Sequence, residues 1–207
     1  LGANTTAANN TAVGFSALTG NTTGTGLVAV GASALDANTT GSNNIGIGLN
    51  AAGGTTSGTG NVAIGTNSLL QNTTGVDNVA VGLYALNANT TAASNTAVGR
   101  SALTANTTGT QNVAVGASAL DANTEGDNNV SLGYGSLTSN TTADNNVAIG
   151  RTALETNTTG AGNVAVGKDA LLANTTASNN TAVGMDALTA NTTGRDNTAL
   201  GFSAGAT

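Results

Sequence analysis

The chain has 207 residues, of which only fourteen are charged, and its formal net charge is −6. Cysteine, proline, histidine and tryptophan are absent, which excludes a disulfide framework and a thiolate metal site. Four Lys and Arg residues are too few to neutralise a nucleic-acid backbone, so we expect no nucleic-acid partner. We expect no cofactor and no metal, and the apolar stretches are too short for membrane contact by this segment.

A 17-residue unit, G-x-x-A-L-x-A-N-T-T-G-x-x-N-V-A-V, is written twelve times without an insertion or deletion. An enzyme places unlike residues at unique positions, whereas a repeated unit builds a surface or a rod. We therefore expect a non-enzymatic fibre. The glycine that opens the unit recurs at Gly14, Gly31, Gly48, Gly65, Gly82, Gly99, Gly116, Gly133, Gly150, Gly167, Gly184 and Gly201.

Each unit is too short for a helix plus a strand, and its glycines and N-T-T-G turns disfavour helices. We expect a short strand at each V-x-V run, as in 62–64, 79–81, 113–115 and 164–166. Strand side chains alternate, so Val62 and Ile64 point to one side and Ala63 to the other. We place the Val/Ile ladder in the interior. A leucine column closes the interior from the other wall: Leu18, Leu35, Leu69, Leu86, Leu103, Leu120, Leu137, Leu154, Leu171 and Leu188.

This pattern predicts an all-β fold, a parallel β-solenoid (β-roll) of twelve 17-residue coils. The recurring glycine predicts a corner with positive φ or a close backbone approach. The asparagine before each strand, as in Asn10, Asn44 and Asn61, predicts an amide ladder that Leu27 alone interrupts.

Thirteen of the charges fall in five of the seventeen columns of the repeat, and Glu125 is the exception. We expect these five columns to face water. Three alanine columns never carry a charge: the centre of the strand, the residue before the leucine, and the second residue after it. Because a solvated face tolerates charge freely, we expect a second chain to cover at least one of them, which predicts an oligomer, with three chains around an axis as the favoured form.

Residues 1–207 form a single repeat domain in which no capping sequence stands out, and Leu1 falls in the leucine column. Terminal repeats of solenoids normally differ from internal ones. We therefore expect the chain to be a segment of a longer fibre.

The run N-V-A-V/I-G-x-x-A-L-x-A-N, as in 78–89, resembles the repeat of the YadA-type head of trimeric autotransporter adhesins, and similar repeats occur in phage tail fibres. The resemblance extends over all twelve coils, although the unit is longer than is usual in those heads. It implies a left-handed parallel β-roll, a homotrimer, an extracellular, cell-surface or virion location, and attachment to a protein or glycan on a host or neighbouring cell.

Five other interpretations are weighed against attachment. A regular ladder of Asn21, Thr23 and their equivalents on a flat wall favours an ice-binding solenoid, but adjacent threonines alternate and leave one outward Thr per coil. The chain could instead be a spacer in a phage tail fibre. N-T-T matches the N-glycosylation signal, or it is a turn that satisfies backbone groups. Scattered carboxylates argue against a calcium array and against catalysis, because only Asp121, Glu125 and Asp127 cluster locally.

A recognition surface, if present, is expected at the variable pair of positions after each recurring glycine. Bulky residues gather there and are expected to align along one edge. The alternative is that an exposed corner simply tolerates many residue types. The candidate binding residues are Tyr84, Arg100, Tyr134, Arg151 and Lys168.

Overall fold

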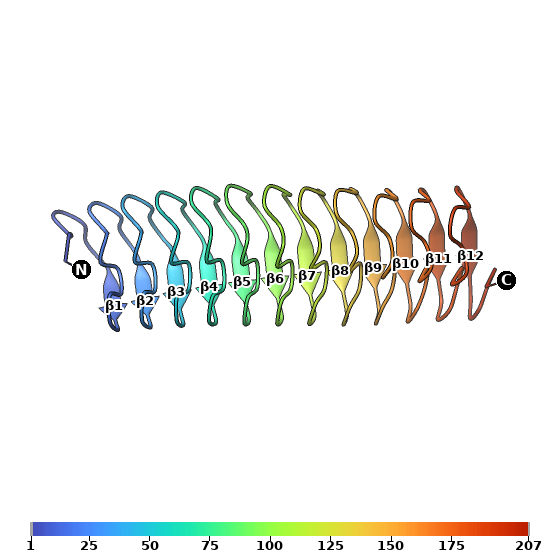
Figure 1. The fold of residues 1–207 in the computed structure, drawn as a ribbon, viewed down its shortest axis with the longest axis horizontal. Coiled ribbons are helices and arrows are strands. Elements are labelled where there is room, and N and C mark those ends of the chain that lie inside the picture. The colour runs from blue at the N-terminus through green and yellow to red at the C-terminus, as the bar shows by residue number, and fades with distance from the viewer. Residues whose placement is uncertain (1, 207) are drawn as a thin grey trace.

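The computed structural model describes residues 2–206, so Leu1, assigned above to the leucine column, and Thr207 lie outside it. The chain forms an elongated rod in which successive coils stack along one axis (Figure 1). Each coil contributes one three-residue strand, and residue i pairs with residue i+17 in parallel register, as Ala63 does with Ala80. The strands form one sheet in chain order. They are β1 (Thr11–Val13), β2 (Val28–Val30), β3 (Ile45–Ile47), β4 (Val62–Ile64), β5 (Val79–Val81), β6 (Thr96–Val98), β7 (Val113–Val115), β8 (Val130–Leu132), β9 (Val147–Ile149), β10 (Val164–Val166), β11 (Thr181–Val183) and β12 (Thr198–Leu200).

Backbone hydrogen bonds join the coils on every side of the rod, not only at the strands. The amide of Leu18 donates to the carbonyl of Ala34 at 3.0 Å, and the amide of Thr39 donates to the carbonyl of Thr56 at 2.9 Å. Since each coil satisfies its backbone groups through its neighbours, a 17-residue unit with only three strand residues can still propagate. The predicted all-β parallel solenoid is confirmed.

The interior holds the alanine side of the strands, so the placement of the Val/Ile ladder inside is wrong. Ala63 at the centre of β4 is 0% exposed, whereas Ile64 is 38% exposed. The leucine column is buried as predicted and packs with these alanines in one core. A coil of seventeen residues encloses a narrow space, which one column of leucines and the small alanine side chains fill. A second column of bulky β-branched residues has no room there.

Two of the three alanine columns are covered by the chain itself, so the inference that a partner must cover them is wrong for these two columns. Ala85 and Ala102, each before a leucine, are 0% exposed and belong to the same core as the strand alanines. The third alanine column, represented by Ala88 and Ala105, is half-buried. The two buried columns lack charge because the single chain encloses them, so their composition is no evidence for assembly, whereas burial within one chain does not explain the third column.

The corner glycines meet both conditions that the sequence predicts. Gly116 has φ +135°, and a Cβ atom at this position would lie 2.5 Å from the carbonyl oxygen of Gly133 in the next coil. The left-handed backbone disfavours other residues, and the overlap excludes any side chain without a shift of the backbone.

The leucine column adopts a conformation that the sequence does not reveal. Leu103 has φ +53°, in the left-handed region, and Leu120 has φ +54°. This region costs a non-glycine residue roughly 1–2 kcal/mol. Full burial of a leucine side chain contributes about 1.5–3 kcal/mol, which offsets that cost.

Candidate binding surfaces

The predicted asparagine ladder runs inside the rod and is confirmed. The amide nitrogen of the Asn61 side chain donates to the side-chain oxygen of Asn44 at 3.1 Å, and the backbone amide of Asn61 donates to the same oxygen at 2.9 Å. Asn44 and Asn61 are both fully buried. Ladder residues therefore use their donors and acceptors within the chain and offer none to a ligand.

A second ladder is formed by the asparagines of the N-T-T turns, which the sequence interpretation placed on an outward wall together with the threonines. The side chain of Asn38 donates to the side-chain oxygen of Asn21 at 2.9 Å and to the carbonyl of Gly41 at 3.0 Å. Asn21 and Asn38 are 0% exposed. The turn interpretation of N-T-T is confirmed, and the internal acceptor amides cannot be glycosylated without opening the coil.

The two threonines of each turn have different roles. The hydroxyl of the first threonine donates to the carbonyl of its counterpart in the next coil, as Thr22 does to Thr39 at 2.9 Å. The second threonine, represented by Thr23 and Thr74, is exposed. One outward threonine per coil was expected, but the first threonine is also exposed in some coils, as Thr39 and Thr73 are, so the expectation is wrong there.

None of the fourteen charged residues is buried, so the expectation that the charged columns face water is confirmed. Within residues 2–206 the one ion pair joins Lys168 Nζ to Asp169 Oδ2 at 2.8 Å. This hydrogen bond raises the pKa of Lys168 and lowers that of Asp169. Burial raises the pKa of Asp121 above its usual range.

The part of the chain that the structure describes contains no cavity, and it has no group of three acidic side chains placed to hold a metal ion. No helix in residues 2–206 is long and apolar enough to cross a membrane. A ligand would therefore contact an open surface of the rod, on an edge or on a face.

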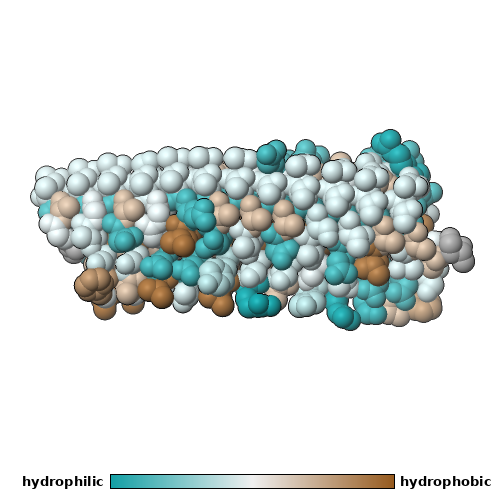
Figure 2. Space-filling view, in the orientation of Figure 1, coloured by the Kyte–Doolittle hydropathy of each residue, from teal (hydrophilic) through white to brown (hydrophobic). Residues whose placement is uncertain are grey.

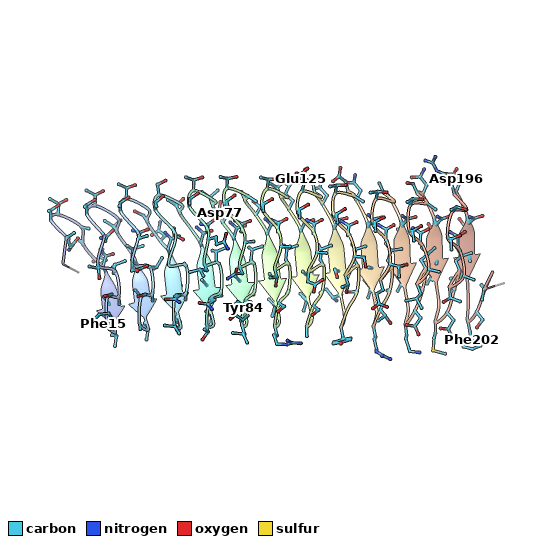
Figure 3. All side chains as sticks on the ribbon, viewed as in Figure 1. Phe15, Asp77, Tyr84, Glu125, Asp196 and Phe202 are labelled. Atoms are coloured by element: carbon cyan, nitrogen blue, oxygen red, sulfur yellow. The ribbon has the colours of Figure 1, made fainter. Side chains whose placement is uncertain are left out.

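The bulky residues after the corner glycines lie along one edge, as expected. We call this edge the corner strip, and define it by the two positions that follow each corner glycine. Figure 3 places Phe15, Tyr84 and Phe202 along the lower edge of the rod, while Glu125 and Asp196 lie along the opposite edge. The five candidate binding residues are all exposed and all belong to the corner strip: Tyr84, Arg100, Tyr134, Arg151 and Lys168. Figure 2 shows hydrophobic and hydrophilic residues mixed along this edge.

A second exposed surface was missed because its side chains were placed in the core. We call it the strand face, and define it by the first and third residues of every strand. It carries Val, Ile, Leu and Thr side chains and no charge in any coil. A signal for it was present in the sequence: the centre of the strand holds only Ala, Gly or Ser, as in Gly46 and Ser131, whereas the flanking positions vary in size.

Comparisons of the chain with models of protein families, with curated proteins and with solved structures find no match.

Proposed function

We propose that the chain is a non-enzymatic structural and adhesive rod that assembles as a homotrimer through the strand face. One observation carries this proposal: the strand face is uncharged over all twelve coils and apolar apart from four threonines, yet a single chain leaves it in contact with water. Side chains such as Ile64 and Ile149 remain more than a third exposed. Contiguous apolar patches of this kind mark sites of association.

Three chains suit this surface because each is straight and presents one apolar face. Three such faces arranged around a common axis bury one another and form a closed assembly. Apolar area removed from water contributes about 25 cal/mol per Å² before the cost of association. The resemblance to YadA-type head repeats supports the same number of chains.

The trimer leaves the two edges of each chain outside, where they are available for attachment. Every coil offers nearly the same environment, and no coil gathers the unlike groups that a reaction requires. These features support a rod that presents repeated surfaces to a host or neighbouring cell, in an extracellular, cell-surface or virion setting. In a phage tail fibre the same rod would serve as a spacer.

Light scattering on the 207-residue chain tests the trimer. One chain has a mass of 19.6 kDa, so three chains give 3 × 19.6 = 58.8 kDa. We expect 58.8 kDa for the parent. The double variant Val98→Lys, Val115→Lys places charge on the strand face and should dissociate the trimer into folded monomers. A monomeric parent would contradict the proposal.

Ice binding is the second candidate function, and the column of exposed threonines favours it. Thr23, Thr40, Thr74 and Thr91 stand at successive or near-successive coils on the edge opposite the corner strip. Adjacent coils are spaced by about 4.8 Å, which gives a regular array of methyl and hydroxyl groups. A freezing gap measured by thermal hysteresis would support this function, and its absence would remove it.

A further inference from the structure

The corner strip contains a repeated pair that the 17-residue unit does not require. Both tyrosines of the chain lie on it, and an arginine follows each one in the next coil: Tyr84 with Arg100, and Tyr134 with Arg151. The two pairs are three coils apart, or about 14 Å at a coil spacing of about 4.8 Å. Ala117, with its small side chain, occupies the corner between them.

The two arginines are free to bind a ligand. Within residues 2–206 the ion pair between Lys168 and Asp169 is the only one, so neither Arg100 nor Arg151 forms an ion pair, although the charge of Arg151 acts on the carboxylate of Asp169 in the next coil. Both arginines are exposed. The tyrosine rings are also open to solvent, with Tyr84 43% and Tyr134 58% exposed. Tyr134 and Arg151 occupy the same column of the repeat in adjacent coils, whereas Tyr84 stands one position after the column of Arg100. Each pair thus places an exposed ring and an exposed guanidinium in adjacent coils of the corner strip.

We propose that these two pairs bind an acidic polysaccharide that lies along the corner strip, parallel to the axis of the rod. This inference rests on the proposed attachment function and names its ligand class. A guanidinium holds a carboxylate or a sulfate with two parallel hydrogen bonds. A tyrosine ring offers an apolar face to the C–H face of a sugar ring, and its hydroxyl can hydrogen-bond a sugar hydroxyl.

The distribution of charge favours a polysaccharide over a nucleic acid. Single-stranded nucleic acid also stacks on aromatic side chains, but it carries a phosphate at every nucleotide and needs a groove rich in cations. The corner strip has two free cations three coils apart, and the chain is acidic as a whole. A polymer with widely spaced anionic groups matches this arrangement, whereas a densely charged one meets the carboxylates of Asp169 and Asp186.

Retention of the chain in affinity electrophoresis tests the proposal. The gels contain hyaluronan, with one carboxylate per disaccharide, as a carboxylated polymer, κ-carrageenan, with one sulfate per disaccharide, as a sulfated polymer, dextran as a neutral one, or poly(U) as a nucleic acid. We expect retention by hyaluronan or κ-carrageenan, and the stronger of the two identifies the anionic group. Arg100→Ala and Arg151→Ala should each weaken binding by about tenfold, since a hydrogen bond to a charged group contributes about 1.5–3 kcal/mol. Tyr134→Ala should also weaken it.

Arg195→Ala is the matched control, because it removes the remaining arginine from a coil position outside the corner strip and should leave retention unchanged. Equal losses for Arg195→Ala and Arg151→Ala would overturn the proposal, as would stronger retention by dextran or poly(U) or no retention by any acidic polymer. Light scattering is run on every variant. A parent that is trimeric but not retained contradicts this inference alone, whereas a retained monomer contradicts only the trimer. Dissociation caused by Arg100→Ala or Arg151→Ala would assign the strip to a contact between chains and overturn the inference.

Discussion

The coil of residues 48–64 and the coil of residues 99–115 show how far the repeat can be weakened. The second follows the repeat unit at every fixed position, with Leu103 and Asn106 in the core. The first has Ala52 in place of the leucine and Thr55 in place of the asparagine. Even so, the amide of Ala52 donates to the carbonyl of Ser68 at 2.9 Å, in the same way that Leu103 donates to Ala119 at 3.0 Å.

The difference between the two coils separates what shapes the rod from what stabilises it. The backbone ladder continues through 48–64 without the usual side chains, so the ladder and the corner glycines define the path of the chain. The side-chain ladder does not continue: Asn72 reaches Thr55 Oγ1 only at 3.5 Å, whereas Asn123 donates to Asn106 Oδ1 at 2.9 Å. We therefore expect 48–64 to be the less stable of the two coils.

Charge inside the regular coil should have the largest effect. The double variant Ala97→Lys, Ala114→Lys places two ammonium groups where the native side chains are 0% exposed. An unpaired buried charge costs several kcal/mol, so the chain should fail to fold, as measured by circular dichroism. Lys at Ser101 and Ser118 is the control and should leave the fold intact. A folded Ala97→Lys, Ala114→Lys variant would refute the placement of the strand alanines in the core.

A side chain at a corner glycine should have the next largest effect. Gly116→Val should lower the free energy of unfolding by more than ~1 kcal/mol from backbone strain alone, and the overlap with Gly133 adds to that loss. Gly201→Val is a matched variant, because Gly201 has φ +124° but no atom lies near its added Cβ. Thermal melting should rank Gly116→Val below Gly201→Val, with Thr59→Val, at an exposed position, near the parent. Equal melting temperatures would show the corner assignment to be wrong.

Truncation of a leucine in the regular coil should lower the free energy of unfolding. Leu103→Ala leaves a cavity between Leu86 and Leu120 and should cost about 2–5 kcal/mol in urea unfolding. It also reproduces in 99–115 what Ala52 does in 48–64. A loss below about 1 kcal/mol would mean that the core collapses around the gap, and that the two coils are equally stable.

Repair of the irregular coil should have a smaller, stabilising effect. Thr55→Asn should restore the ladder of turn asparagines between Asn38 and Asn72, and should add about 1 kcal/mol per hydrogen bond regained. Hydrogen exchange should then slow in 48–64. Unchanged exchange there would show that the amide ladder does not limit the stability of this coil.

The smallest effect concerns Asp121, whose pKa is raised chiefly by burial. A carboxyl with a raised folded pKa stabilises the fold at low pH, and that contribution is lost as the pH rises through the folded pKa. Asp121→Asn should therefore raise the melting temperature slightly at pH 7, and the gain should vanish below the ordinary value of 3.8. Asp77→Asn at an exposed position is the control. A gain that persists at pH 3 would assign the effect to a cause other than ionisation.

The period, the parallel solenoid, the corner glycines, the leucine column and the first asparagine ladder could all be predicted, because each follows from a column of the repeat. The side of the strand that faces inward could not be predicted from alternation, which separates Val62 and Ile64 from Ala63 without saying which side is buried. The restriction of the strand centre to Ala, Gly or Ser indicates that this side is the buried one. The left-handed conformation of Leu103 left no sequence signal, since leucine rarely adopts it.

The corner strip was predicted from the bulk of its residues, and its alignment follows from the exact period. The strand face was missed because β-branched side chains were expected in the core. The role in assembly that we propose for it replaces the one first given to the alanine columns. Both surfaces depend on the same turn at the corner glycine, which directs the strand face to one side and the corner strip to the edge.

Thiol labelling of single-cysteine variants distinguishes a covered strand face from an open one, because the chain has no cysteine of its own. The variants are Ala97→Cys in the core, Val98→Cys on the strand face and Ser101→Cys on the corner strip. We expect rapid labelling at Ser101→Cys, protection of Ala97→Cys under all folded conditions, and protection of Val98→Cys only while the trimer is intact. Labelling of Val98→Cys as fast as that of Ser101→Cys in the native protein would contradict a covered strand face.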